Sequence, residues 1–80
     1  MDIFIANLST KTGEYNLRTL FEAYGKVSKV EIIKNICGIS MGMGILEMPD
    51  ENEAIRAINK LNGVKIDGVP IHAEIAKKKK

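Results

Sequence analysis

The chain of 80 residues is long enough for one compact domain and too short for two. Its apolar share of 45% and charged share of 28% exclude a disordered composition, and no apolar run approaches the roughly 20 residues that cross a bilayer. Four of its twelve basic residues are the lysines at 77–80, which leaves eight basic against ten acidic groups in residues 1–76. A broad basic surface is therefore excluded.

Cys37 is the only cysteine, so the chain has neither an internal disulfide nor the clustered cysteines of a zinc site. Its neighbours include no base or positive charge that would make the thiol reactive. The first residues also lack the basic and apolar segments of a secretory signal. We therefore expect a cytoplasmic protein in a reducing compartment.

The first half of the chain predicts a strand, a helix and a second strand. Residues 2–6 alternate, with Ile3 and Ile5 on one side and Phe4 on the other. A helix over about 14–24 is predicted by apolar residues at spacings of three and four, namely Leu17, Leu20, Phe21 and Tyr24, with Gly25 ending it. Residues 27–34 then predict a strand whose inward residues are Val30 and Ile32 and whose outward residues are Glu31 and Ile33.

The second half repeats this order after a short loop. Residues 40–48 predict a third strand, in which we expect Gly42 and Gly44 to face the helices and allow close packing. Asp50 and Glu53 predict the capping box of a second helix, whose expected buried stripe is Ala54, Ile55, Ala57, Ile58 and Leu61 and whose end is Asn62-Gly63. A final strand is predicted from residue 69 to 75, after the Asp67-Gly68 turn.

The predicted order is β-α-β-β-α-β. Because crossovers between strands are right-handed, both helices fall on the same side of one four-stranded antiparallel sheet. The predicted fold class is therefore α+β, a ferredoxin-like sandwich. Its other sheet face stays open, and we expect function there.

With these motifs in this order, the chain resembles the RNA recognition motif family over residues 1–76, followed by a basic tail at 77–80. Ile3-Phe4-Ile5-Ala6-Asn7-Leu8 fits the family's six-residue signature. The stretches that resemble its helices and its entry into the last strand are Leu17-x-x-Leu20-Phe21-x-x-Tyr24-Gly25, Ala54-x-x-Ala57-Ile58-x-x-Leu61-Asn62-Gly63 and Ile66-Asp67-Gly68-Val69-Pro70-Ile71.

The resemblance implies that bases of single-stranded RNA stack on aromatic rings of the two central strands. Carried over by position, the ring of the first strand is Phe4, whereas the two rings of the third strand are replaced by Met43 and Ile45. The basic position that would meet a phosphate is Met41. Stacking is worth about 1 to 3 kcal/mol per base, so the loss of two rings predicts weak binding.

We accordingly predict a weak single-stranded RNA site on the open face, made of Phe4, Ala6, Ile33, Met41, Met43, Ile45, His72 and Glu74, with Lys77 and Lys78 of the basic tail. The alternative is a protein-interaction or dimerisation domain that uses the same apolar face, because Met-rich apolar surfaces suit protein contacts equally well. A subclass of such domains grips a partner tryptophan through an Arg-x-Phe motif, which residues 63–67 lack.

The sequence favours neither a metal nor catalysis. Soft or borderline ligands are present in Cys37, Met41, Met43 and His72, but copper domains of this element order bind through paired cysteines after the first strand, where this chain has Asn7-Leu8-Ser9-Thr10. No Ser/His/Asp set and no phosphate-binding glycine loop is recognisable. We therefore expect a binding domain without cofactor or metal, and no contact with a membrane.

Overall fold

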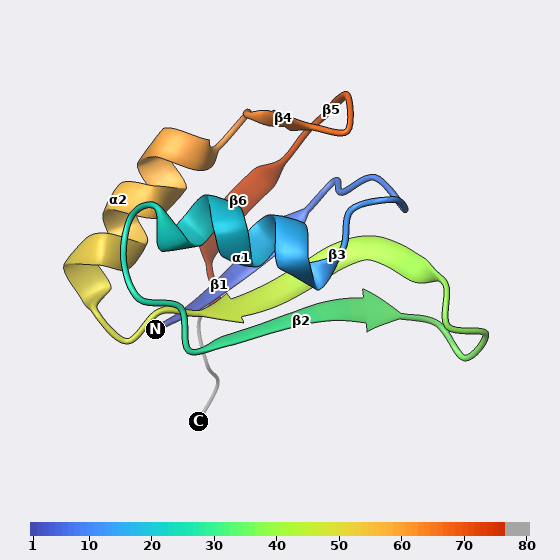
Figure 1. The fold of residues 1–80 in the computed structure, drawn as a ribbon, viewed down its shortest axis with the longest axis horizontal. Coiled ribbons are helices and arrows are strands. Elements are labelled where there is room, and N and C mark those ends of the chain that lie inside the picture. Colours follow the sequence, from blue (N-terminus) through green and yellow to red (C-terminus); the bar gives the residue numbers. More distant parts are fainter. Residues whose placement is uncertain (77–80) are drawn as a thin grey trace.

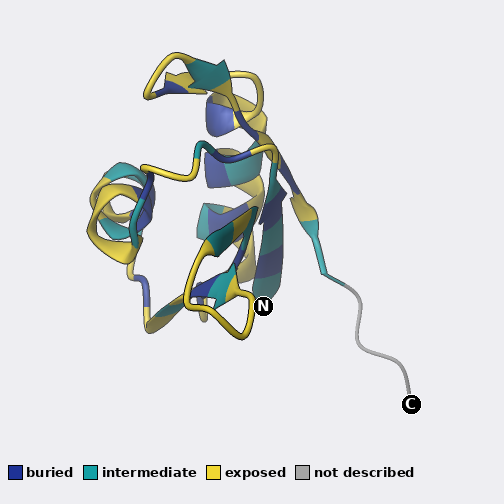
Figure 2. Ribbon diagram, turned by 90° about the vertical axis from the view of Figure 1, so that its right-hand side faces the viewer, coloured by how far each residue is buried: buried dark blue, intermediate teal, exposed yellow. Residues whose placement is uncertain are grey.

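The computed structural model describes residues 1–76 and shows eight elements in two layers (Figure 1). They are β1 (Asp2–Ala6), α1 (Glu14–Glu22), β2 (Lys29–Lys34), β3 (Ser40–Glu47), α2 (Glu51–Leu61), β4 (Lys65–Ile66), β5 (Val69–Pro70) and β6 (His72–Ile75). The main sheet has the order β2-β3-β1-β6, and its described neighbours are all antiparallel. Both helices lie on one side of it (Figure 2), which confirms the predicted fold class.

The core lies between the sheet and the helices because each strand alternates. Ile3 and Ile5 of β1 are completely buried, whereas Phe4 between them is not. Leu17 and Phe21 of α1 are buried against the same layer. None of the helices within residues 1–76 is long and apolar enough to cross a membrane.

Of the two glycines of β3, only Gly44 has the predicted role. A Cβ atom at Gly44 would lie 3.3 Å from Cδ1 of Leu17, so its missing side chain does let α1 approach. Gly42 instead has a φ of +75° in an irregularity of the β2–β3 pairing, and its carbonyl accepts a hydrogen bond from the Leu8 amide at 2.9 Å. The expectation that Gly42 faces the helices is wrong, because the chain bulges there toward the loop after β1.

The start of α2 forms only half of the predicted capping box. The Asp50 carboxylate accepts a hydrogen bond from the Glu53 amide at 3.0 Å, as a cap should. The Glu53 carboxylate does not return to Asp50 but accepts from the Lys26 amide at 3.3 Å. Ile55 is 42% exposed and therefore not part of the buried stripe, because it lies about 100° around the helix from Ala54.

The predicted strand over 69–75 is wrong as one element. Val69–Pro70 pairs with Lys65–Ile66 in a separate hairpin, turned by Asp67 and Gly68 at positive φ, and only His72–Ile75 joins the main sheet. The chain changes partners at Ile71, whose amide donates to the Val64 carbonyl at 3.0 Å. Pro70 has no amide hydrogen to donate, which suits its position in this short two-stranded hairpin.

Residues 62–64 run along the outer side of β6. The Asn62 side-chain amide donates to the Ala73 carbonyl and accepts from the Ala73 amide, both at 2.9 Å. The Gly63 amide donates to the Ile71 carbonyl at 2.8 Å. The end of α2 is thereby fixed to the margin of the sheet.

Candidate nucleic-acid interface

The open sheet face consists of the strand residues that alternate away from the helices, and the register arranges them in rows across the strands. In the central row, Phe4 of β1 lies directly opposite Ile45 of β3 and Glu74 of β6. Ile45 in turn lies opposite Glu31 of β2. The phenyl ring therefore has an aliphatic neighbour on one side and a carboxylate on the other.

A second row lies nearer the β2–β3 hairpin. Ile33 pairs with Met43, and Ala6 pairs with His72. Directly opposite side chains on one face of a sheet lie about 5 Å apart at their Cβ atoms. The two rows thus join Phe4, Ile45 and Met43 into one continuous apolar platform.

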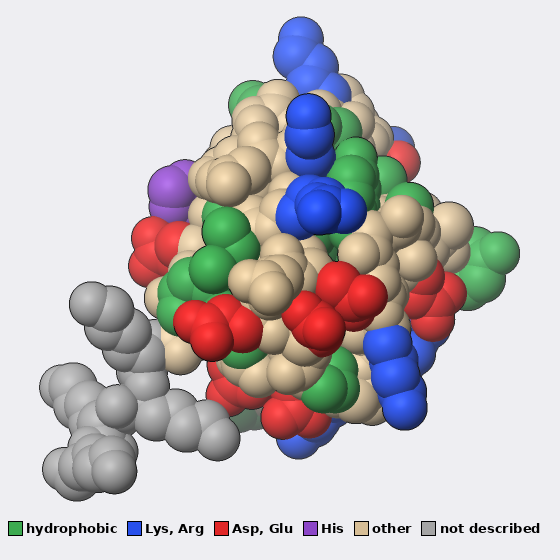
Figure 3. All heavy atoms as spheres, turned by 90° about the vertical axis from the view of Figure 1, so that its left-hand side faces the viewer, with side chains coloured by type: hydrophobic (Ala, Val, Ile, Leu, Met, Phe, Trp, Pro, Cys, Tyr) green, Lys and Arg blue, Asp and Glu red, His purple; other side chains and the backbone are tan. Residues whose placement is uncertain are grey.

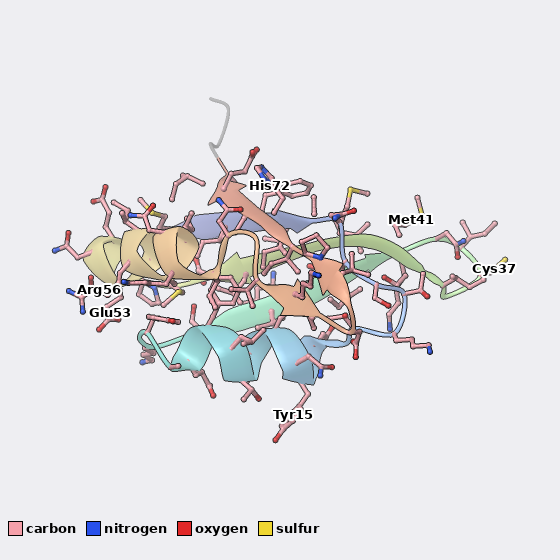
Figure 4. The ribbon with its side chains drawn as sticks, turned by 90° about the horizontal axis from the view of Figure 1, so that it is seen from above. Tyr15, Cys37, Met41, Glu53, Arg56 and His72 are labelled. Carbon is pink, nitrogen blue, oxygen red and sulfur yellow. The ribbon has the colours of Figure 1, made fainter. Side chains whose placement is uncertain are left out.

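Met41 extends this platform beyond the bulge. The register shifts between Ile33 and Lys34, so alternation alone does not determine which way Met41 points. Figure 4 shows Met41 and His72 on the side of the sheet opposite α1, from which Tyr15 projects the other way. Met41 is 51% exposed, and Ile45 is 36% exposed.

His72 and Glu74 are bonded to each other. The Nε2 atom of His72 lies 2.9 Å from Oε1 of Glu74, and both side chains are more than half exposed, at 57% and 59%. Because the pair is solvated, either group can exchange its partner for the edge of a base at small cost. A ligand on Phe4 would meet this pair at the β6 side.

The third row is charged and had not been included in the predicted site. Asp2 and Glu47 are direct partners across β1 and β3, and Glu47 also lies opposite Lys29 of β2. Oε1 of Glu47 accepts a hydrogen bond from the Ser28 hydroxyl at 2.8 Å. Aspartate and glutamate side chains gather over the end of the molecule where β1 begins and α2 starts (Figure 3).

The sequence also gave no role to the loop between β2 and β3. Ile36 is fully exposed and Ile39 is 56% exposed, so apolar surface continues past Met41 to the tip of this hairpin. The signal was available, since two isoleucines beside Gly38 are unusual in a short turn. Lys29 is likewise predictable on the open face, because it lies two residues before Glu31 in the same strand.

The structure places eight of the ten predicted site residues on this face: Phe4, Ala6, Ile33, Met41, Met43, Ile45, His72 and Glu74. Lys77 and Lys78 lie outside the described residues. Within residues 1–76, no group of three or more His, Cys, Asp or Glu side chains could hold a metal ion. Cys37 is exposed in the hairpin loop.

Known proteins are similar to this chain in sequence and in fold. RNA-binding protein 4B of Homo sapiens is 39% identical over 77 residues, and polyadenylate-binding protein 4 of Arabidopsis thaliana is 27% identical over 79 residues. These matches cover 96% and 99% of the chain but only 20% and 12% of the relatives, so the chain spans at most a fifth of their length.

Solved structures match over the whole chain. The crystal structure of RNA Binding Protein PG1 has a TM-score of 0.93 and 33% identity, covering 100% of this chain and 98% of that one. The structure of Sex-lethal RNA recognition domains 1 and 2 from Drosophila melanogaster has a TM-score of 0.90 and 23% identity, covering 96% of this chain and 50% of that one. The family model of the RNA recognition motif matches residues 3–72. The chain therefore belongs to the RNA recognition motif family.

Proposed function

We propose that this protein binds single-stranded RNA weakly on its open sheet face, with Phe4 as the principal stacking residue. The observation that carries the proposal is the central row, in which an aromatic ring lies at the middle of the sheet beside Ile45. Family membership supports the same ligand, because related domains stack bases on rings of the two central strands. Met43 and Met41 extend the contact along β3.

Binding is weak because two rings are missing. Aliphatic and thioether side chains recover part of the stacking energy by dispersion, yet each lost ring removes about 1 to 3 kcal/mol per base. Carboxylates flank the platform at Glu31 and Glu74, and they repel phosphates that run along either edge. The platform contacts base faces, which all bases present, so stacking by itself gives little preference for sequence.

The His72–Glu74 pair on β6 provides the polar groups that can orient the edge of a bound base. A carboxylate accepts hydrogen bonds from exocyclic amino groups such as N4 of cytosine. Glu74, directly beside Phe4, is placed for this contact once His72 releases it. A preference for amino-bearing bases is therefore the selectivity that the described residues support.

One observation favours a second function, protein docking or dimerisation. Exposed apolar side chains continue from Ile45 through Met41 to Ile39 and Ile36, which is more apolar surface than a stacking site for bases requires. Methionine adapts to irregular protein surfaces. This alternative uses the same face and therefore competes with RNA.

An NMR titration of the full chain with a degenerate pool of short single-stranded RNA separates the two functions. RNA binding predicts shifts of the amides of Phe4, Met43 and Ile45 that saturate as RNA is added. Protein docking predicts no response to RNA, together with shifts of Met41, Met43 and Ile45 when the protein itself is concentrated. Amides of α1 serve as the internal reference, and an unchanged sheet in the RNA arm contradicts the proposal.

A further inference from the structure

The open face carries a net negative charge where an RNA-binding surface needs the opposite sign. Its strand residues include four carboxylates, those of Asp2, Glu31, Glu47 and Glu74, against the single ammonium of Lys29, a balance of −3 with His72 neutral. Affinity for RNA depends strongly on neutralised phosphates. Something must offset these carboxylates if the face is to accept an RNA strand.

The described part of the chain ends next to this charge. Ile75 pairs with Ile3, and the Ala76 amide donates to the Asp2 carbonyl at 2.9 Å. The sequence continues from there with four lysines at 77–80. The largest positive charge of the protein is therefore tethered beside Asp2 and Glu47, which are direct partners on the open face.

The tether is long enough to reach from β6 past β1 to β3. Four extended residues span roughly 13 Å. Neighbouring strands lie about 4.8 Å apart, so β2 is about 14 Å from β6 and β3 is closer still. The backbone of the tail can thus reach from Asp2 to Glu47 in the third row, and the lysine side chains extend from there toward Glu31 in the central row.

Resting on the proposed function, we propose that the basic tail docks on the carboxylates of Asp2, Glu47 and Glu31 on the open sheet face and acts as their built-in counterion. The four lysines change the balance of the face from −3 to +1. An RNA strand then meets lysines that are already paired with carboxylates. The docked tail allows RNA to approach the face. RNA binding then forms fewer new ion pairs than it would with four unpaired lysines.

Docking itself is tested without RNA. A nitroxide attached at position 80 of a Cys37→Ser, Lys80→Cys chain should broaden the amide signals of Glu47 and Glu31 more strongly at low salt than at high salt and leave those of α1 sharp. The neutralised chain, Asp2→Asn with Glu47→Gln, should lose this selective broadening. The matched control is Glu22→Gln, which removes a carboxylate from α1 and should change nothing. Broadening that is uniform, or that survives neutralisation, overturns the proposal.

The second arm measures the salt dependence of binding to oligocytidylate. Four unpaired lysines would contribute about 2.8 to the slope of log affinity against log salt, from about 0.7 per phosphate neutralised on a single strand. In the unmodified chain, truncation after Ala76 should lower this slope by clearly less than about 2.8. In the neutralised chain, the same truncation should lower the slope by about 2.8. Equal changes in the two backgrounds overturn docking. If no variant binds RNA, the proposed function fails, while the nitroxide arm still decides where the tail lies.

Discussion

Phe4 and Ile45 lie directly opposite each other at the middle of the open sheet face. Alternation predicts the side of the sheet on which each residue lies, but not which residue lies opposite it. It places Phe4 and Ile45 on the open face because side chains along a strand have a period of two. Their direct pairing follows from the strand register, which depends on bulges and loops that periodicity does not encode. The same limit explains Gly42, because the bulge at this position interrupts the alternation of the strand.

Replacing Phe4 tests the platform. Phe4→Ala should weaken binding to a short single-stranded oligonucleotide about 5- to 150-fold, which corresponds to the loss of one stacked base at about 1–3 kcal/mol. Fluorescence anisotropy measures this directly. Tyr15→Ala is the matched control, because it removes a ring that is 80% exposed on α1. Equal losses from both variants would contradict a site on the sheet.

Replacing Gly42 tests the bulge. Gly42→Ala should lower the free energy of unfolding by about 1–3 kcal/mol, because a side chain at positive φ is strained and its Cβ would lie 3.0 Å from the Leu8 carbonyl oxygen. Gly38→Ala is the control, with a φ of +80° and no atom within 4 Å of the added Cβ. Urea denaturation should show the larger loss for Gly42→Ala.

At the scale of elements, the existence and order of the helices and main strands were predictable from the sequence, whereas their ends and their pairing partners were not. Apolar periodicity gave the two helices and four main strands, because amphipathic patterns are long enough to read. The split at Ile71 depends on a hydrogen bond to Val64, a contact between segments that no local pattern specifies. Glu53 likewise bonds Lys26, a residue far away in the sequence, in place of the helix cap.

The start of α2 depends on Asp50. Asp50→Ala should destabilise the protein by about 1 kcal/mol, since the Glu53 amide loses its acceptor. Chemical denaturation measures the change. Asn52→Ala, on the same exposed turn but without a capping bond, should cost much less. A similar loss in both variants would mean that helix propensity, not the cap, is responsible.

Strand β3 offers a gain of function. Met43→Phe restores a ring at the position where the family has one, beside Ile33 on the open face. RNA affinity should rise several-fold, by less than the about 5- to 150-fold of a full stacked base at about 1–3 kcal/mol, because methionine already supplies part of the contact. Ile55→Phe adds the same ring to α2, where that position is 42% exposed, and should leave the affinity unchanged.

At the scale of the whole molecule, charge is divided between two regions. Residues 1–76 have eight basic and ten acidic groups, and the four lysines at 77–80 reverse the sign of the total. Composition predicted this division, but not that the described chain ends beside Asp2 and its partner Glu47. That proximity depends on the antiparallel pairing of β6 with the first residues of β1.

Removing the tail should weaken RNA binding in a salt-dependent way. Truncation after Ala76 should lower the affinity at low ionic strength, and the difference should shrink as salt screens the phosphates. A chain with glutamine in place of all four lysines separates charge from length and should behave like the truncated one. Undiminished affinity of the truncated chain at low salt would remove the tail from the interaction.

The attachment of residues 62–64 to β6 protects this edge of the sheet from aggregation. An outer strand normally presents unpaired amides and carbonyls on which another molecule can build. Here Asn62 and Gly63 occupy those groups at Ala73 and Ile71. The opposite margin, β2, begins and ends in lysine, whose charge discourages the same growth. Extension of the main sheet by another chain is thereby disfavoured at both of its margins.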